Sequence, residues 1–399
     1  MKSRKRGMTR RDFMKTMAVA GAAANSHGLL TTCGDAFGST GKQGSPPRVV
    51  HVHDVRATHW DYKTGWYGDG VDQNVVDAMM DRGIMELTGK GSVAQAWRVI
   101  LPAYQPGQKI AVKVNFNNAI YGSSGQVIDA IPQPVNALVK GLKSIGVRED
   151  DIWVYDVTHA WHISQIPFRF MDKISPQYPG VQFHANDDLH TVTLGFSDTE
   201  RVHFTVPEGR KIPDRRIGNT LVKATYLINM PIIKKHRMAG VSLSFKNHFG
   251  SIEGNDLLHW SVTLDDPLYL PTYSSLIDLY ANRNFNEKTV LVIGDALYGA
   301  RINNYTEVPN PWPTFGNRSP NSLFFSRDPV AIDSVMYDFL EADGGVPKGS
   351  DNYLKLAAVH GLGVFEHRDA SGGYKNIDYR YIKETATSVY LKRADLNAA

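Results

Sequence analysis

From residue 48 onward the chain alternates short, β-branched apolar runs with longer segments whose apolar residues recur at helical spacing. The apolar runs lie at residues 48–55, 109–115, 151–157, 225–230 and 289–293. The helical segments lie at residues 74–88, 134–145, 274–281, 329–341 and 353–360. Strands separated by helices of this length pair in parallel, because each crossover returns the chain to the same end of the sheet. The pattern predicts an α/β fold, with a mostly parallel sheet flanked by helices.

One interval interrupts this alternation. Residues 159–219 are richer in Pro, Asp, His and aromatic residues, with short alternating pieces at 191–196 and 201–206. We expect an inserted irregular or antiparallel subdomain there. The chain has 399 residues and no internal repeat, and we divide it into three parts. They are a leader at 1–32, a flexible tether at 33–47 and one α/β domain at 48–399.

The basic charge belongs to the N-terminus. Residues 1–24 contain seven Lys or Arg and one Asp, so they hold +6 of a chain whose net charge is +4. The remainder, at −2, gives no reason to expect nucleic-acid binding. Residues 9–15 (Thr-Arg-Arg-Asp-Phe-Met-Lys) resemble a twin-arginine export signal, and the weakly apolar residues 16–24 are too few to span a membrane. We expect the twin-arginine translocation machinery to be a partner, and a location in the periplasm or tethered to the extracytoplasmic face of the membrane.

Two processing routes stay open. Three alanines at 22–24 suit a signal peptidase. Alternatively, residues 30–33 (Leu-Thr-Thr-Cys) resemble a lipobox in which Cys33 becomes lipidated, and the Gly-, Ser- and Pro-rich residues 34–47 then form a tether. Any attachment to the membrane is expected only through this N-terminal lipid. Because Cys33 is the single cysteine, a disulfide framework and an iron–sulfur cluster are excluded.

Polar residues follow the predicted strands where the apolar runs end. They are Asn115, Asn117, Asp156, Asn229 and Asp295. In a parallel α/β sheet, ligands bind outside the carboxyl ends of the strands. Asn and Asp are also common turn and helix-cap residues, so each position alone has a structural explanation. Their recurrence at one predicted edge indicates a binding site.

A cluster of cationic residues follows the apolar run at 225–230. Residues 234–237 are Lys-Lys-His-Arg, and Lys246 and Asn247 precede Gly250. Lysine supplies a point charge, asparagine supplies amide donors, and glycine lets the backbone approach a ligand closely. A run of charge is also typical of a solvated loop. From composition alone, an anion site and an exposed basic loop are equal alternatives.

Residues 231–250 resemble the signature of the family known as domain of unknown function 362. That signature joins a Pro-x-x-Lys-x-His segment to a Ser/Thr-rich strand and then to Lys-Asn-x-x-Gly. The matching positions are Pro231, Lys234, His236, Ser242, Lys246, Asn247 and Gly250. Further matches, which extend the resemblance over residues 109–363, are Lys113, Asn115, Asp156, Asp295 and the segments 328–333 and 354–363. The resemblance implies site candidates but no established reaction, and the cysteine clusters of some members are missing here.

A divalent metal is the competing interpretation of the strand ends. Asp156, His159 and His162 follow one predicted strand, and an Asp with two His residues can bind Zn, Mn or Fe. No HExxH, Walker, GxSxG or Rossmann pattern accompanies them. For His51 and His53, two apart on a predicted strand, we expect a structural role.

Two aspartates border the predicted helix at 329–341. Asp328 before Pro329 is typical of a helix N-cap. Asp333 lies beside apolar residues, and a carboxylate there needs a partner. We expect a lysine of the cationic cluster to supply it.

These patterns lead us to expect an exported α/β enzyme that acts on a small anionic substrate at the carboxyl edge of the sheet. The predicted anion-binding residues are Lys113, Asn115, Lys234, Lys246 and Asn247. His236 is the candidate general acid or base, since its unperturbed pKa lies near neutrality. Asp295, with Asp156, is expected to orient a substrate hydroxyl, a water or a metal. The alternatives are a periplasmic ligand- or cofactor-binding protein without turnover, and a structural surface lipoprotein.

Overall fold

The computed structural model describes residues 45–117, 127–157, 166–186, 190–207, 209–301 and 308–384. All of these belong to one compact unit that spans Gly38–Ala399. Its centre is a ten-stranded mixed sheet formed by the described residues. The main path of the sheet runs in the order β12 (Asp378–Lys383), β1 (Arg48–His53), β11 (Ser322–Ser326), β10 (Thr289–Ala300), β7 (Tyr226–Asn229), β2 (Ile110–Lys113), β3 (Ile152–Tyr155) and β4 (Gln182–His184).

Most neighbouring strands are parallel, as predicted. β7, β2, β3 and β4 pair in parallel, and β7 is also parallel to β10. The exceptions are β11, which is antiparallel to both β1 and β10, and β9 (Gly240–Ser242), which is antiparallel to β8 (Ile232–His236). β8 pairs with the second half of β10 and so continues the line of β7. The carboxyl ends of β2, β3 and β7 therefore meet at one edge.

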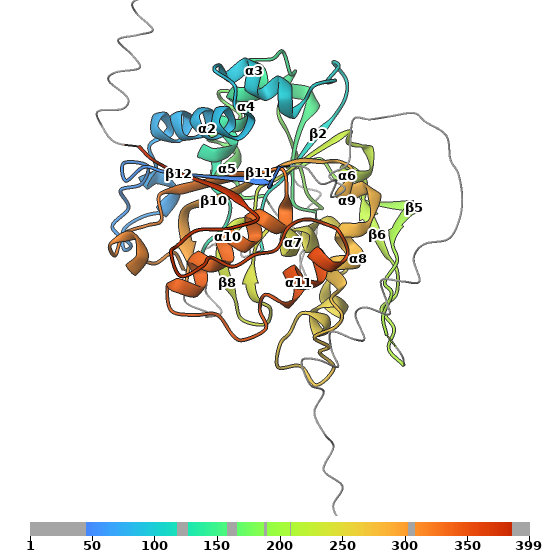
Figure 1. Ribbon diagram of the computed structural model, residues 1–399. Coiled ribbons are helices and arrows are strands. Elements are labelled where there is room, and N and C mark those ends of the chain that lie inside the picture. The colour runs from blue at the N-terminus through green and yellow to red at the C-terminus, as the bar shows by residue number, and fades with distance from the viewer. Residues whose placement is uncertain are drawn as a thin grey trace, which may run out of the picture. The chain divides into compact units, whose positions relative to one another are not determined.

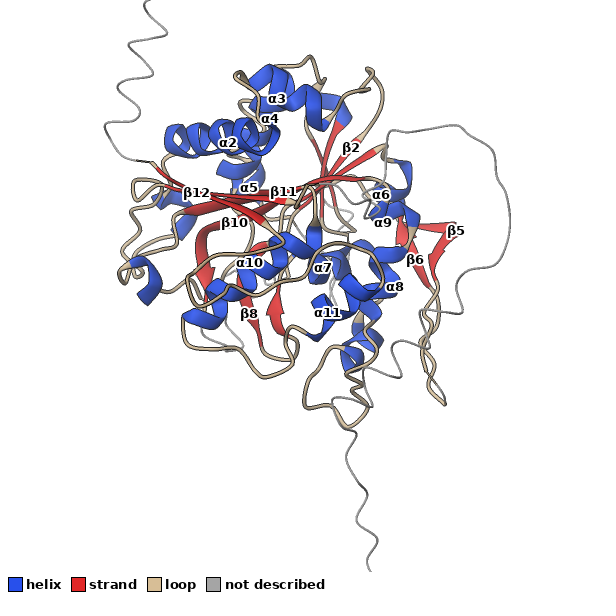
Figure 2. Ribbon diagram, in the orientation of Figure 1, coloured by secondary structure: helices blue, strands red, loops and turns tan. Residues whose placement is uncertain are grey.

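Helices cover both faces of the sheet, because buried side chains alternate along each strand. In β2, for example, Ile110 and Val112 belong to one hydrophobic core and Ala111 to the other. The first core is covered by α2 (Gln73–Thr88), α3 (Val93–Ile100), α4 (Pro132–Lys143) and α5 (Phe168–Met171) (Figure 1). The second is covered by α6 (Asn219–Lys223), α7 (Ser244–Asn247), α8 (Ser275–Ala281), α9 (Arg283–Asn286), α10 (Pro329–Ala342) and α11 (Asn352–Val359) (Figure 2). Lys113, which follows Val112, points into this second layer.

Short 3₁₀ turns connect these elements. They are η1 (Tyr67–Gly70), η3 (Glu149–Asp151), η4 (His248–Ser251), η5 (Asp256–Ser261) and η6 (Pro313–Phe315). In the described ranges no helix has the length and apolar character needed to cross a membrane.

The predicted antiparallel insertion is confirmed in β5 (Phe196–Val202) and β6 (Arg215–Gly218), which form a separate two-stranded sheet. The rest of the interval 159–219 contributes to the main layers. β4 extends the main sheet beyond β3, and Phe170 of α5 packs in the first core.

The two aspartates near α10 have different outcomes. Asp328 caps the helix, as predicted, and its Oδ1 accepts hydrogen bonds from Val330 N and Ala331 N, both at 2.9 Å. The prediction that a lysine pairs with Asp333 is wrong. The Asp333 carboxylate instead accepts hydrogen bonds from Ser244 N at 2.9 Å and Tyr353 Oη at 3.0 Å, because the start of α7 packs directly against α10.

Candidate functional site

The ends of β2 and β3 carry a buried ion pair. Lys113 Nζ lies 3.1 Å from Asp156 Oδ1 and donates to Val114 O at 2.5 Å and Asn247 Oδ1 at 3.3 Å. Asp156 Oδ2 accepts a hydrogen bond from Phe116 N at 2.7 Å. Burial lowers the pKa of Lys113, and the adjacent Asp156 opposes that shift. The pair therefore neutralises one buried lysine at the bottom of the site.

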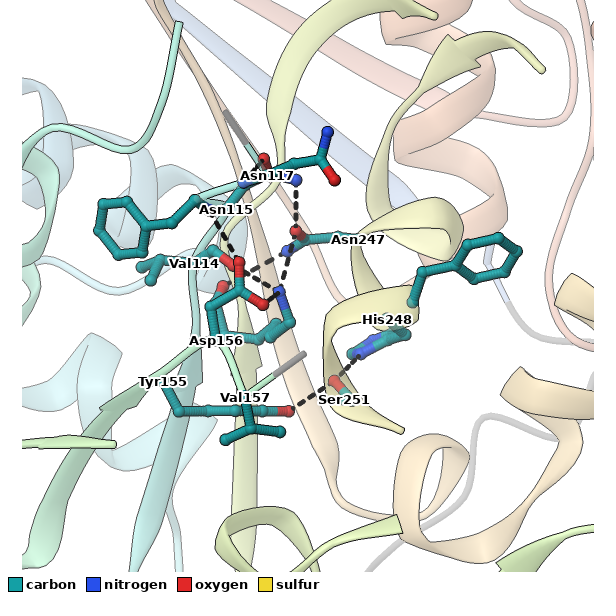
Figure 3. Close-up of polar contacts among 12 residues, drawn as sticks. Val114, Asn115, Asn117, Tyr155, Asp156, Val157, Asn247, His248 and Ser251 are labelled. Atoms are coloured by element: carbon teal, nitrogen blue, oxygen red, sulfur yellow. Dashed lines mark hydrogen bonds and ion pairs between the residues drawn. The ribbon is translucent and has the colours of Figure 1, made fainter. Parts of the chain in front are cut away.

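A chain of amides links the strand ends to α7 (Figure 3). Asn115 Nδ2 donates to Asn247 Oδ1 at 3.1 Å. Asn247 Nδ2 donates in turn to Asn229 Oδ1 at 2.7 Å, and Asn229 Nδ2 donates to Ser244 O at 2.9 Å. Because each amide satisfies its neighbour, every side chain in this chain has one orientation. This network positions Asn247, and with it the neighbouring Lys246.

The cationic cluster forms a strand instead of a solvated loop. β8 alternates, so Lys234 and His236 project to one face and Lys235 to the other. Lys234 is opposite Ser242 of β9 in the hairpin register and is only 1% exposed. Lys235 donates to Gly344 O at 3.4 Å, away from the site.

A small pocket opens where these elements meet. Its open space is about 400 Å³, including the mouth. The lining residues are Lys113, Asn115, Asn117, Asp156, Lys234, His236, Ser242, Lys246, Asn247, Phe249, Gly250, Asn255 and His259. We call it the polar pocket.

His236 is held as a neutral hydrogen-bond donor. Its Nδ1 accepts hydrogen bonds from Met238 N at 3.2 Å and Ala239 N at 3.1 Å, so its proton resides on Nε2. Burial, followed by the positive charges of Lys246 and Lys234, keeps the pKa of His236 well below 6.5. At neutral pH the imidazole is therefore uncharged.

The hydrogen bonds of His259 place a proton on Nδ1, the nitrogen that accepts in His236. His259 Nδ1 donates to the carbonyl oxygens of Asn255 at 3.1 Å and Asp256 at 3.3 Å. Its Nε2 lies 3.4 Å from Lys246 Nζ, which can only donate, so this nitrogen is the acceptor. The same Nζ lies 4.0 Å from the centre of the Phe249 ring. Lys246 Nζ is thus in contact with an imidazole nitrogen and with an aromatic face.

The polar pocket has an excess of positive charge. Of the lining residues, Lys113, Lys234 and Lys246 carry positive charge, Asp156 carries negative charge, and His236 is neutral. The formal charge of its lining is therefore +2. A lining of this charge can hold an anion through charge-assisted hydrogen bonds from the ammonium groups.

The structure brings most of the predicted site residues together. The candidates that line the polar pocket are Lys113, Asn115, Asp156, Lys234, His236, Lys246 and Asn247. They come from β2, β3, β8 and α7, and only the fold places them around one space.

Asp295 lies elsewhere. The sequence predicted that Asp295 follows the end of a strand. This prediction is wrong, because β10 continues past Asp295 to Ala300 along β8 and β11. Its neighbours Ile293 and Leu297, two residues away on either side, belong to the first core, so its side chain is on the opposite face from Lys113. Burial raises the pKa of Asp295 to about 7.

The predicted metal ligands are only partly described. His159 and His162 lie outside the described residues, as does the predicted lipidation site Cys33. The carboxylate of Asp156 forms an ion pair with Lys113. Elsewhere in the described residues, possible ligand atoms of Asp338, Glu341 and His367 lie within 4.8 Å of one another. His51 is held by hydrogen bonds to Tyr379 Oη and Ser322 Oγ, both at 2.8 Å.

The sequence interpretation missed three residues of the polar pocket, Phe249, Asn255 and His259. Asn255 and His259 lie after the recognised motif, in the loop and 3₁₀ turn η5. They match none of the spacings that we considered. Their position after Gly250 was the only available signal, because the chain turns back over the site there.

A family model matches the chain over residues 110–338, more than half its length. This chain belongs to the domain of unknown function 362 family. The family resemblance predicted from the sequence is confirmed. The residues that line the polar pocket of this family member all lie inside the matched region. A second model, for the twin-arginine translocation signal, matches residues 7–25, so the chain carries an export signal that implies the twin-arginine machinery as a partner.

No curated protein matches the chain significantly. Among solved structures, a protein from Thermotoga maritima is similar at a TM-score of 0.34 and 11% identity, over 57% of this chain and 51% of its own. The lactate racemase apoprotein from Thermoanaerobacterium thermosaccharolyticum is similar at a TM-score of 0.33 and 13% identity, over 64% of this chain and 52% of its own. The chain thus spans about half the length of each.

Proposed function

We propose that this protein is an exported enzyme that acts on a small, doubly charged anion in the polar pocket. One observation supports the proposal: three buried or nearly buried lysines and one carboxylate are among the described residues that line a single space. Lysine ammonium groups that converge on one space form strong, charge-assisted hydrogen bonds to an anionic ligand.

The lysines have different roles in this proposal. Lys113 is paired with Asp156 and forms the floor. Lys234 and Lys246 hold the anion, because they carry the excess charge of the lining. Asn247 is fixed between Asn115 and Asn229 and positions the end of α7 beside the anion.

His236 acts as an electrophile in this proposal. Its Nε2–H is a hydrogen-bond donor, and its Nδ1 is occupied by two backbone N–H groups. A neutral imidazole of this kind stabilises negative charge that develops on a substrate oxygen. In our proposal this role replaces the general acid or base expected from the sequence, since a base needs a free ring nitrogen with a lone pair and an efficient general acid needs a protonated imidazolium.

Calorimetric titration of the purified, leader-free protein with sulfate, phosphate and dicarboxylates tests the binding step. Lys246→Gln is expected to weaken binding about tenfold or more, because a charge-assisted hydrogen bond is lost. The matched control is Lys235→Gln, which removes the same charge from the other face of β8 and is expected to leave affinity nearly unchanged. Equal losses in the two variants, or no binding by the unmodified protein, would contradict the proposal.

Turnover separates an enzyme from a binding protein. Proton NMR of an anion mixture incubated with the protein reports consumption of any substrate. His236→Ala, which removes the Nε2–H donor, is expected to abolish that consumption and to change affinity little. A protein that binds tightly and consumes nothing supports the alternative, a ligand-binding protein without turnover.

Export places this chemistry outside the cytoplasm in our proposal, in the periplasm or tethered to the membrane. Tethering depends on acylation of Cys33, which stays a prediction.

A further inference from the structure

One buried acceptor in the polar pocket has no donor. Asn255 is 4% exposed and lines the pocket. Its Nδ2 donates to Phe249 O at 3.0 Å, and because a carbonyl oxygen can only accept, this contact sets the orientation of the amide. Asn255 Oδ1 is shielded from solvent, and within the described residues no hydrogen-bond donor reaches it.

The side-chain oxygens of Asn247, Asn115 and Asp156 in the same pocket are all contacted by donors or cations. Asn247 Oδ1 accepts hydrogen bonds from Lys113 Nζ and Asn115 Nδ2. Asn115 Oδ1 accepts a hydrogen bond from Asn117 N at 3.3 Å. Both oxygens of Asp156 are contacted by donors or cations. A buried acceptor without a donor destabilises a protein, so an unpaired one beside a pocket indicates that the ligand supplies the missing hydrogen.

We propose that Asn255 is a specificity-determining residue that accepts a hydrogen bond from a hydroxyl group of the bound anion. This inference rests on the proposed function of the polar pocket and narrows its substrate class. The ligand is an oxyanion that also carries an O–H group. A hydroxylated carboxylate and a hydrogen phosphate share this chemistry.

The rest of the lining explains why Asn255 can discriminate. Lys234 and Lys246 offer only N–H donors, and His236 offers Nε2–H. An anion without a hydroxyl satisfies these donors and leaves Asn255 Oδ1 unpaired. An anion with a hydroxyl satisfies both, and a site with a buried polar group disfavours analogues that lack the matching group.

Two pairs of anions with equal charge test the inference by calorimetry at mildly alkaline pH. They are hydrogen phosphate with sulfate, and malate with succinate. In the unmodified protein the hydroxyl-bearing member of a pair is expected to bind about tenfold more tightly, the effect of one hydrogen bond. A preference in the phosphate pair alone, or in the carboxylate pair alone, identifies which source of the hydroxyl the pocket accepts.

Asn255→Leu removes the acceptor at nearly constant shape. The preference is expected to disappear, and affinity for sulfate and succinate is expected to stay within about twofold. The matched control is Asn284→Leu, which removes another buried amide, one bonded to Glu200 at 2.8 Å and remote from the pocket lining. It is expected to keep the preference.

The outcomes distinguish the two proposals. If the unmodified protein binds the anions without a preference for a hydroxyl group, the role of Asn255 is overturned and the proposed anion site is not. This outcome does not depend on whether a variant folds. A preference that survives in Asn255→Leu also overturns it. If none of the four anions binds, the proposed function fails first.

Discussion

At Gly250 the backbone passes close to the Lys113–Asp156 ion pair at the floor of the polar pocket. The Gly250 carbonyl accepts a hydrogen bond from Val157 N at 3.0 Å, which draws η4 against the end of β3. A Cβ atom at this position would lie 2.0 Å from Asp156 Oδ1 and 2.8 Å from Lys113 Nζ. Glycine is therefore required here by space, because the ion pair occupies the volume of any side chain.

Gly250→Ala is expected to lower the free energy of unfolding by about 1–3 kcal/mol, since overpacking forces the buried pair apart. Urea denaturation measures this loss. The matched control is Gly91→Ala, where no heavy atom lies within 4 Å of the added methyl group. If the two variants unfold at the same urea concentration, the close approach at Gly250 is unimportant for stability.

At the scale of elements, the imidazole of His367 joins the segment after α11 to α10 and α11 through hydrogen bonds. His367 Nδ1 lies 2.6 Å from Asp338 Oδ1 in α10, and His367 Nε2 lies 3.0 Å from Asp351 Oδ2 at the start of α11. Both ring nitrogens face carboxylates, so the ring is an imidazolium. These two contacts raise the pKa of His367 to about 9.

Stability is expected to fall as pH rises above neutrality. His367 binds its proton more tightly in the folded protein than in the unfolded chain, so its contribution is complete below pH 6.5 and is lost through about pH 9. Urea denaturation across this range measures the loss, and His367→Gln is expected to flatten the profile. His203→Gln is the control, because His203 also contacts an aspartate but its side chain is 79% exposed. An unchanged profile in His367→Gln would assign the pH dependence to other groups.

The length of β10 could not be predicted from the local sequence pattern. The apolar run at 289–293 predicted a short strand, yet β10 extends to Ala300. Gly294 and Asp295 end the run in the sequence, but pairing with β8 and β11 continues the hydrogen-bond ladder through them. Asp295 was therefore predicted at a strand end and lies within a strand.

At the scale of the whole molecule, charge separates the leader from the body of the chain. The leader has a net charge of +6 and the remainder of the chain a net charge of −2, and the twin-arginine signal spans residues 7–25. The receptor of this pathway recognises the arginine pair itself, not charge alone.

Replacing both Arg10 and Arg11 with Lys is expected to retain the precursor in the cytoplasm, although net charge is unchanged. Cell fractionation and immunoblotting measure the distribution. The control replaces Lys2 and Lys5 with Gln, which removes two charges outside the pair and is expected to permit export. Export of the Arg-pair variant would assign the leader to another pathway.

Some properties of this protein are encoded locally and were predictable from the sequence. Periodicity determined the α/β class, because apolar spacing selects strand or helix within a few residues. The leader and the Lys-x-His and Lys-Asn segments were also recognisable, since each is a contiguous motif. Together they named Lys234, His236, Lys246 and Asn247, which the structure brings to the lining of the polar pocket.

Other properties exist only in the tertiary structure. The tautomer of His236 depends on a turn that folds its own backbone onto Nδ1, and the partners of Asp333 depend on how α7 packs against α10. Asn255 and His259 reach the pocket because the chain after Gly250 turns back over the site. Strand order, register and helix packing are set by contacts between distant segments, and no local pattern of residues encodes which side chains those contacts bring together.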